Sequence, residues 1–233
     1  MKKVKILAAS AMAALMLMTG ACSSMTNMGK GALIGGGGGS ALGAGIGALI
    51  GGGKGAAIGA AIGAGVGAGA GTLIGNRMDK QKKELEAQLA EKAKVEEVKD
   101  SNGLAAIKVT FDSGILFPTN GTTLSATAQQ ELSEFARNII NNPDTDIQIY
   151  GFTDNTGTMA VNERVATGRA DAVLSYLANC GVAPTRLRAQ GIPMADYVAS
   201  NETAAGRAEN RRVEIYITAD KTMIEKAENG TLS

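Results

Sequence analysis

The amino-acid sequence predicts an α/β sandwich in the second half of the chain, preceded by a glycine-rich helical hairpin and a signal peptide. Lysines and a short apolar run come before Cys22, which is the pattern of an export signal. Glycine then recurs at every fourth position from 31 to 75. From residue 94 onward, strand-like and helix-like patterns alternate. This alternation indicates one sheet covered by helices, in a domain large enough to fold alone.

Residues 1–21 contain the parts of a signal peptide. Lysines stand among the first five positions, the uncharged run 6–18 follows, and small residues lead up to Cys22. The run is too short for a transmembrane helix. Small residues directly before a cysteine resemble a bacterial lipobox, although Thr19 stands where leucine is usual. The resemblance implies that Cys22 is acylated and anchored in outer-membrane lipid, and plain secretion with cleavage nearby is the alternative.

Residues 22–30 are interpreted as the lipidated tether. Two serines follow Cys22 and no aspartate holds the next position, which by analogy with enterobacterial sorting rules favours the outer membrane. The tether also lacks the acidic run that is associated with surface export in some bacteria. We therefore expect a protein that is anchored in the outer membrane and faces the periplasm.

Residues 31–76 are predicted to form a glycine-zipper helical hairpin. Large apolar residues keep to a row beside the glycines, as in small-xxx-small helix contacts. Lys54 is the only charge between Lys30 and Arg77 and marks the turn of the hairpin. Copies of the chain could associate as a homo-oligomer through the glycines of residues 31–75. The alternative is a flexible linker rich in glycine and alanine.

The remaining segments are assigned from their periodicity. A charged helix, 77–93, has Leu85 and Leu89 on one side and is interpreted as a spacer. The α/β domain is expected at 94–219, and residues 220–233 are expected to be a frayed tail. Within the domain, a helix from 125 to 141 should face inward through Leu132, Phe135, Ala136 and Ile139. The expected strands are 95–98, 104–111, 147–152, 186–191 and 212–218.

The functional prediction depends on the polar turn 153–157 and the helix that follows it. On a helical wheel, Asn162 and Arg169 fall in the middle of an apolar stripe that includes Val161. A buried arginine needs an anionic partner or a cavity, because an unpaired buried charge costs several kcal/mol. Asp154 is the nearest candidate in the sequence.

A guanidinium and a carboxylate at the mouth of a strand-turn-helix unit suit a zwitterionic ligand. The arginine can bind a carboxylate through two parallel hydrogen bonds, and the aspartate can bind an ammonium group. A salt bridge between Asp154 and Arg169 themselves is equally compatible with their spacing.

A series of separated motifs runs from the polar turn toward the end of the domain. They are Thr153-Asp154, Gly157, Asn162, Arg169-Ala170, Val173, Gly181-Val182, Asn201-Glu202-Thr203, Gly206-Arg207-Ala208 and Asn210-Arg211-Arg212-Val213-Glu214-Ile215. In order and spacing they resemble the OmpA-like C-terminal domain, which OmpA, the peptidoglycan-associated lipoprotein Pal and the flagellar motor protein MotB share. The resemblance covers roughly residues 94–219. Phe152 stands where histidine is usual and residues 191–193 replace the common Gly-Tyr-Gly, which affects the rim of the family's pocket.

The resemblance implies non-covalent binding of peptidoglycan through the diaminopimelate of its stem peptide. It assigns the ligand clamp to Asp154, which follows Thr153 in the turn, and to Arg169. Asn162 and Arg211 match positions that line the same pocket in the family. These five residues are the candidate binding site.

Composition narrows the classes of function. The net charge of +1, without a basic block interleaved with aromatic residues, argues against a nucleic-acid partner. The chain contains no histidine, which excludes a Ser-His-Asp triad, a histidine zinc site and a histidine general base. Cys180 has no histidine to activate it. A peptidoglycan-cleaving enzyme is therefore disfavoured, and we expect neither catalysis nor a cofactor.

The sequence thus predicts an outer-membrane lipoprotein that tethers the membrane to the cell wall. Acylated Cys22 provides the membrane attachment, and the pocket of Asp154 and Arg169 provides the attachment to peptidoglycan. The alternative function is that of an envelope-assembly or membrane-perturbing factor, which would act through self-association of the glycine zipper.

Overall fold

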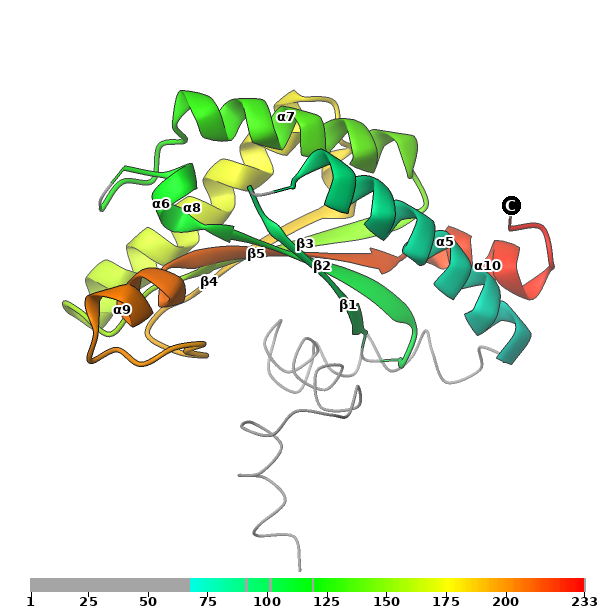
Figure 1. The fold of residues 1–233 in the computed structure, drawn as a ribbon. Helices are drawn as coiled ribbons and strands as arrows, with labels where there is room; N and C mark the ends of the chain where they lie inside the picture. Colours follow the sequence, from blue (N-terminus) through cyan, green and yellow to red (C-terminus); the bar gives the residue numbers. More distant parts are fainter. Residues whose placement is uncertain (1–67, 91, 101, 119, 233) are drawn as a thin grey trace, which may run out of the picture. The chain divides into compact units, whose positions relative to one another are not determined.

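The computed structural model describes residues 68–90, 92–100, 102–118 and 120–232. The signal peptide, Cys22 and most of the glycine-zipper segment lie outside these residues. One sheet has the strand order β1-β2-β5-β3-β4, in which β3 and β4 are parallel and the other neighbours are antiparallel (Figure 1). Its strands are β1 (Lys94–Lys99), β2 (Ala105–Asp112), β3 (Thr145–Phe152), β4 (Leu187–Ile192) and β5 (Arg212–Ala219).

Helices α5, α7, α8 and α10 enclose the main hydrophobic core with one face of the sheet (Figure 1). Short helices α6 and α9 lie toward one end of the sheet, and the 3-10 helix η1 leads into β4. The helices are α5 (Ala68–Gln88), α6 (Ser113–Leu116), α7 (Ala126–Asn141), α8 (Met159–Asn179), η1 (Pro184–Arg186), α9 (Ala204–Asn210) and α10 (Lys221–Glu228). The predicted fold class, one sheet covered by helices, is confirmed.

Local chemistry explains where the helices of the domain begin. Ser125 caps α7, because its side-chain oxygen accepts a hydrogen bond from the backbone N–H of Ala128 at 3.0 Å. Thr158 caps α8 in the same way, accepting from the N–H of Val161 at 3.4 Å. The four residues predicted to face inward from α7 are all buried. The observed bounds of the predicted helices and strands of the domain lie within a few residues of the expected ones.

The charged helix before the domain is part of its core. The interpretation of residues 77–93 as a spacer is wrong, because α5 packs against β1, β2, α7 and α10. Its buried residues recur at helical spacing: Ala70, Ile74, Met78, Gln81 and Leu85, with Leu89 just beyond the helix. The amide Nε2 of Gln81 donates to Asn138 Oδ1 of α7 at 3.0 Å, a buried polar contact between the two helices. The folded unit thus extends upstream of residue 94.

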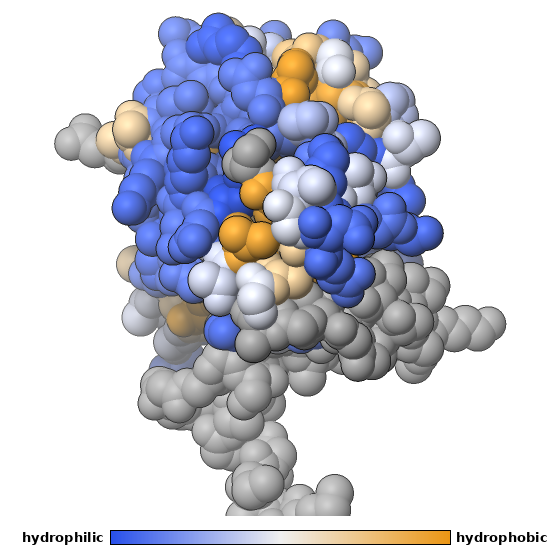
Figure 2. Space-filling model, turned by 90° about the vertical axis from the view of Figure 1, so that its right-hand side faces the viewer, coloured by the Kyte–Doolittle hydropathy of each residue, from blue (hydrophilic) through white to orange (hydrophobic). Residues whose placement is uncertain are grey.

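The last segment of the chain is also ordered against the core. The expected frayed tail contains α10, which is capped by Asp220 and buries Met223, Ile224 and Ala227. Where atoms are described, the end of the domain seen in Figure 2 is mostly hydrophilic, with small separate apolar groups. The apolar residues of α10 are turned inward, so the expectation of fraying is wrong. None of the described helices combines the length and the apolar character needed to cross a membrane.

Two glycines set how closely α8 approaches the sheet. Gly151 of β3 and Gly191 of β4 are directly opposite each other in the parallel ladder. A Cβ atom at Gly151 would lie 2.3 Å from the carbonyl oxygen of Ala166, and one at Gly191 would lie 2.5 Å from the backbone nitrogen of Thr167. Any larger residue would therefore force the backbone of α8 away from the sheet.

The face of the sheet opposite this core carries a second cluster, which contains Val98, Ala106, Tyr150, Phe152, Ile192 and Tyr216. Among them lies a buried ion pair, in which Arg212 Nε donates to Glu214 Oε1 at 2.6 Å. The hydroxyl of Tyr216 donates to the other oxygen of Glu214 at 2.7 Å. The guanidinium carbon of Arg212 stands 3.8 Å from the ring centroid of Phe152, in a cation–π contact.

Candidate functional site

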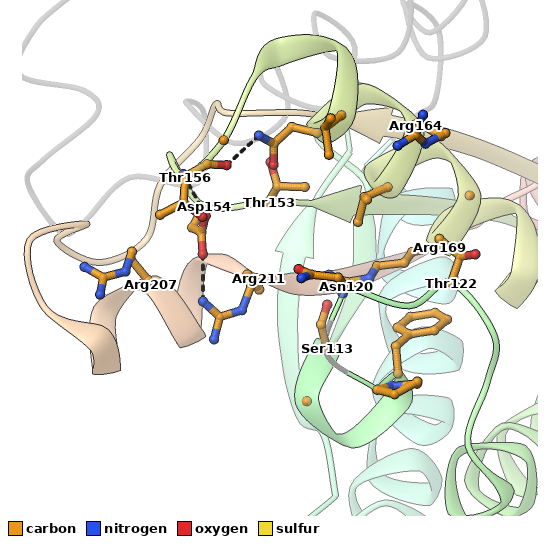
Figure 3. Close-up of a pocket in the computed structure, with 18 residues that line it drawn as sticks. Ser113, Asn120, Thr122, Thr153, Asp154, Thr156, Arg164, Arg169, Arg207 and Arg211 are labelled. Atoms are coloured by element: carbon orange, nitrogen blue, oxygen red, sulfur yellow. Dashed lines mark hydrogen bonds and ion pairs between the residues drawn. The ribbon is translucent and has the colours of Figure 1, made fainter.

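A pocket of about 990 Å³ opens at the end of the sheet near α6 and α9 (Figure 3). Four segments line it: the start of α6 with the loop behind it, the turn after β3, one face of α8, and the end of α9. All five residues predicted from the sequence line this one pocket: Thr153, Asp154, Asn162, Arg169 and Arg211. Long-range folding therefore brings them together from three separate parts of the chain.

Asp154 is held as an ionised carboxylate at the base of the turn. One oxygen accepts a hydrogen bond from Arg211 Nη1 at 2.7 Å, and the other accepts one from the backbone N–H of Thr156 at 2.8 Å and a short one from its hydroxyl. Burial raises the pKa of this carboxyl group, but the hydrogen bonds from Thr156 and Arg211 outweigh burial, and the net pKa is lowered. The carboxylate is thus available as an acceptor over a wide pH range.

Arg169 is 3% exposed, and in the described part of the chain it forms no salt bridge with Asp154. Its Nε donates to the carbonyl oxygen of Gly121 at 3.0 Å, and its guanidinium carbon stands 5.3 Å from the ring centroid of Phe117. Burial lowers the pKa of Arg169, the charge of Arg211 lowers it further, and the charge of Asp154 raises it. The salt bridge between Asp154 and Arg169 that the spacing allowed is replaced by one between Asp154 and Arg211.

Asn162 and Thr153 hold the turn that carries Asp154. The Nδ2 of Asn162 donates to the carbonyl oxygens of Thr156 and Thr158, at 2.8 and 3.0 Å. The hydroxyl of Thr153 accepts a hydrogen bond from the backbone N–H of Met194, in the loop after β4, at 3.0 Å. Both side chains are buried and already engaged with the backbone, so their main contribution is to position the turn.

The loop from β4 to α9 is folded by the asparagines of the later motifs, which brings Arg211 to the pocket. Asn210 Oδ1 accepts from the N–H groups of Val198 and Ala199, at 2.8 and 3.0 Å. Asn201 Oδ1 accepts from Asn155 N at 3.3 Å, which joins this loop to the turn of Asp154. These contacts give a structural reason for the Asn201 and Asn210 motifs.

Several residues at the site were missed by sequence reasoning. Thr156 lies two positions after Asp154, and that spacing is the signal of an Asx turn. Ser113 gave no such signal, and its hydroxyl is buried with no hydrogen-bond partner among the described residues. Val161 was placed on the apolar stripe, but it is 44% exposed and lines the pocket, so that assignment is wrong. Arg164, Arg207 and the loop around Phe117 also line the pocket.

Most of the residues that line the pocket are polar or charged. The described residues contain no group of three acidic, cysteine or histidine side chains arranged to hold a metal ion. The pocket instead presents one aspartate, four arginines and several hydroxyl and amide groups. Such donors and acceptors recognise charged organic groups through directional hydrogen bonds.

Curated relatives match the second half of the chain. Probable lipoprotein YiaD of Escherichia coli is 38% identical over 133 residues, 57% of this chain and 61% of that protein. Outer-membrane lipoprotein YfiB of Pseudomonas aeruginosa is 32% identical over 47% of this chain and 66% of that protein. Peptidoglycan-binding protein ArfA of Mycobacterium tuberculosis is 35% identical over 48% of this chain and 35% of that protein. The chain spans less than two thirds of the length of each.

Solved structures and family models agree with the fold. The crystal structure of a putative MotB like protein from Desulfovibrio vulgaris is similar with a TM-score of 0.55 and 26% identity, covering 64% of this chain and 94% of that one. Residues 116–211 match the model of the OmpA family, and residues 1–79 match that of the YMGG-like Gly-zipper. The two matches cover successive parts of the chain, and the OmpA family match includes most of the residues that line the pocket.

Proposed function

We propose that the pocket binds the diaminopimelate part of peptidoglycan and that the chain tethers the outer membrane to the cell wall. The observation that supports this proposal is that Asp154 and Arg169 line one pocket without neutralising each other. Asp154 is oriented by Thr156 and Arg211, and Arg169 by Gly121 and Phe117. Two opposite charges, each fixed by its own neighbours, form a preorganised receptor for a zwitterion.

The side-chain end of diaminopimelate carries an ammonium and a carboxylate on one carbon atom. With Nε bonded to Gly121, the two terminal nitrogens of Arg169 can donate to that carboxylate in parallel. The carboxylate of Asp154 can accept from the ammonium. The Phe117 ring beside Arg169 excludes water from one side, which strengthens the charged hydrogen bonds. ArfA, a relative, is named for peptidoglycan binding, which supports the same ligand class here. The role is binding, with no bond broken.

Binding to isolated cell walls tests the proposed ligand. We expect the purified full-length protein in detergent to sediment with sacculi that contain diaminopimelate, and not with walls that contain lysine at the same stem position. Lysine lacks the second carboxylate and leaves Arg169 without a partner. Free diaminopimelate should release the protein, whereas free lysine should not. Equal sedimentation with both kinds of wall would exclude diaminopimelate as the recognised group.

The membrane attachment is proposed to be acyl chains on Cys22, in line with the two relatives named as lipoproteins. Each buried CH₂ contributes about 0.8 kcal/mol, so several acyl chains hold a protein on a membrane almost permanently. We expect Cys22→Ser to move the protein from the membrane to the soluble periplasmic fraction. Labelling with a clickable fatty acid should mark the wild type and not the variant, and an unlabelled wild type would contradict this anchor.

The lowered pKa of Asp154 predicts how wall binding depends on pH. The folded-state pKa lies below the ordinary value of 3.8, so the carboxylate and its stabilising contacts persist above 3.8 and are lost as pH falls through the lower value. Binding to sacculi should be lost over the same acidic pH range, which is the acid limb of its pH profile. Thr156→Val removes one hydrogen-bond donor and should move the acid limb to higher pH, whereas Thr185→Val, at an exposed site, should not. Identical acid limbs in the wild type and both variants would contradict this assignment.

A further inference from the structure

The pocket carries more positive charge than a diaminopimelate zwitterion can neutralise. Four arginines line it, Arg164, Arg169, Arg207 and Arg211, and the single acidic residue is Asp154. The lining therefore has a net charge of +3. A zwitterion is neutral overall, so its binding leaves this excess unchanged. Concave sites lined by one sign of charge concentrate ligands of the opposite sign.

Salt bridges in the described part of the chain pair only one of these four arginines with an acidic side chain. That arginine is Arg211, which pairs with Asp154. Arg207 Nη1 donates to the carbonyl oxygens of Asn201 and Glu202, at 2.7 and 3.2 Å, which orients the guanidinium without cancelling its charge.

The spacing of the arginines also points to an anionic partner. Arg207 lies in the last turn of α9 and Arg211 is the residue that caps it, so two cations adjoin at this end of the helix, and Asp154 pairs only with Arg211. Figure 3 places Arg207 beside the Asp154 turn and Arg164 on the side of α8, so the cations border the pocket from both sides. A ligand with an additional negative group relieves the repulsion between these cations, and a neutral one does not.

We propose that the pocket selects stem peptides in which the α-carboxylate of the glutamate residue is free, in addition to the diaminopimelate zwitterion. The same peptides with that glutamate carboxylate amidated should bind less tightly. This inference rests on the proposed function. Glutamate is joined to diaminopimelate through its side-chain carboxyl group, so its α-carboxylate stays free and lies farther along the peptide from the zwitterion. Arg164 and Arg207 border the pocket from opposite sides, and one of them receives that carboxylate. Amidation removes the charge and changes the shape very little.

The test compares two soluble ligands on the full-length protein in detergent by titration calorimetry. One is the tripeptide Ala-γ-Glu-diaminopimelate with the glutamate α-carboxylate free, and the other has that carboxylate amidated. A charge-assisted hydrogen bond predicts about tenfold tighter binding of the free form. Either Arg164→Gln or Arg207→Gln, whichever removes the receiving side chain, should reduce this preference by about threefold, as for an exposed ion pair. Arg137→Gln, an exposed arginine outside the pocket lining, should leave it unchanged.

Each outcome has a distinct meaning. A preference for the free form that falls in either pocket variant supports the inference. Equal binding of the two tripeptides overturns it and leaves the proposed function intact, and so does a preference that survives both substitutions. If neither tripeptide binds, the proposed function fails together with the inference.

Discussion

Asp154→Asn and Arg169→Gln are each expected to abolish co-sedimentation with diaminopimelate-containing sacculi. Asp154→Asn keeps the shape of the side chain and removes its charge, and Arg169→Gln replaces the guanidinium with a neutral amide on a shorter side chain. Loss of one partner of a buried charged hydrogen bond costs about 2–5 kcal/mol, which lowers affinity about thirtyfold or more. The measurement is the bound fraction of the full-length protein across a series of sacculus concentrations.

Both variants should remain folded. Asp154→Asn leaves Arg211, whose side chain is 42% exposed and can be solvated by water. Arg169→Gln leaves no carboxylate unpaired, because no described carboxylate forms a salt bridge with Arg169. Asp171→Asn, on the exposed side of α8, is the matched control and should bind like the wild type. Undiminished sedimentation of both pocket variants, with circular dichroism spectra unchanged, would refute the clamp.

Glu214→Gln is expected to destabilise the domain by about 3–5 kcal/mol, because it leaves the buried guanidinium of Arg212 without its counter-charge. The side chains of the pair are 5% and 6% exposed, so water cannot replace the lost carboxylate. The variant also weakens the acceptor of the Tyr216 hydroxyl. Urea unfolding measures the change, and Glu97→Gln, at an exposed position of β1, should stay close to the wild type.

A double substitution separates the ion pair from simple packing. Arg212→Met combined with Glu214→Leu removes both charges, so no uncompensated charge stays buried. We expect the double variant to be more stable than Glu214→Gln alone. If the two are equally unstable, or if Glu214→Gln unfolds at the same urea concentration as the wild type, the ion pair does not carry the stability assigned to it.

Periodicity predicted the secondary structure well, because it reports which residues must leave water. The spacing of Leu132, Phe135 and Ile139 identified both α7 and its buried face. The same signal could not show what covers the other residues. Leu85 and Leu89 were interpreted as one side of an isolated spacer. The contacts that join this helix to the core are long-range: the hydrogen bond from Gln81 to α7 joins residues 57 positions apart, which no local pattern reveals. Local patterns identify elements, and long-range contacts decide whether those elements join the core.

The same difference between local patterns and long-range contacts applies to the candidate site. The resemblance to the OmpA-like domain predicted one pocket for Asp154, Arg169 and Arg211, and the structure places all three there. The partner of Asp154 was not predictable from proximity along the chain, because Arg211 lies 57 positions away. Arg169 is likewise oriented by Gly121, which is 48 positions away. The composition of the pocket was accessible from the sequence, but the pairing of its charges required the fold.

The two glycines beneath α8 influence how far apart the charged groups of the pocket lie. Asp154 follows the strand that contains Gly151, whereas Arg169 belongs to the helix that rests on Gly151 and Gly191. The thickness of the helix–sheet layer therefore contributes to the distance between the two charged groups. A methyl group at either glycine would widen that layer. Engineering the receptor for a longer zwitterion would accordingly begin at residues 151 and 191, outside the pocket itself.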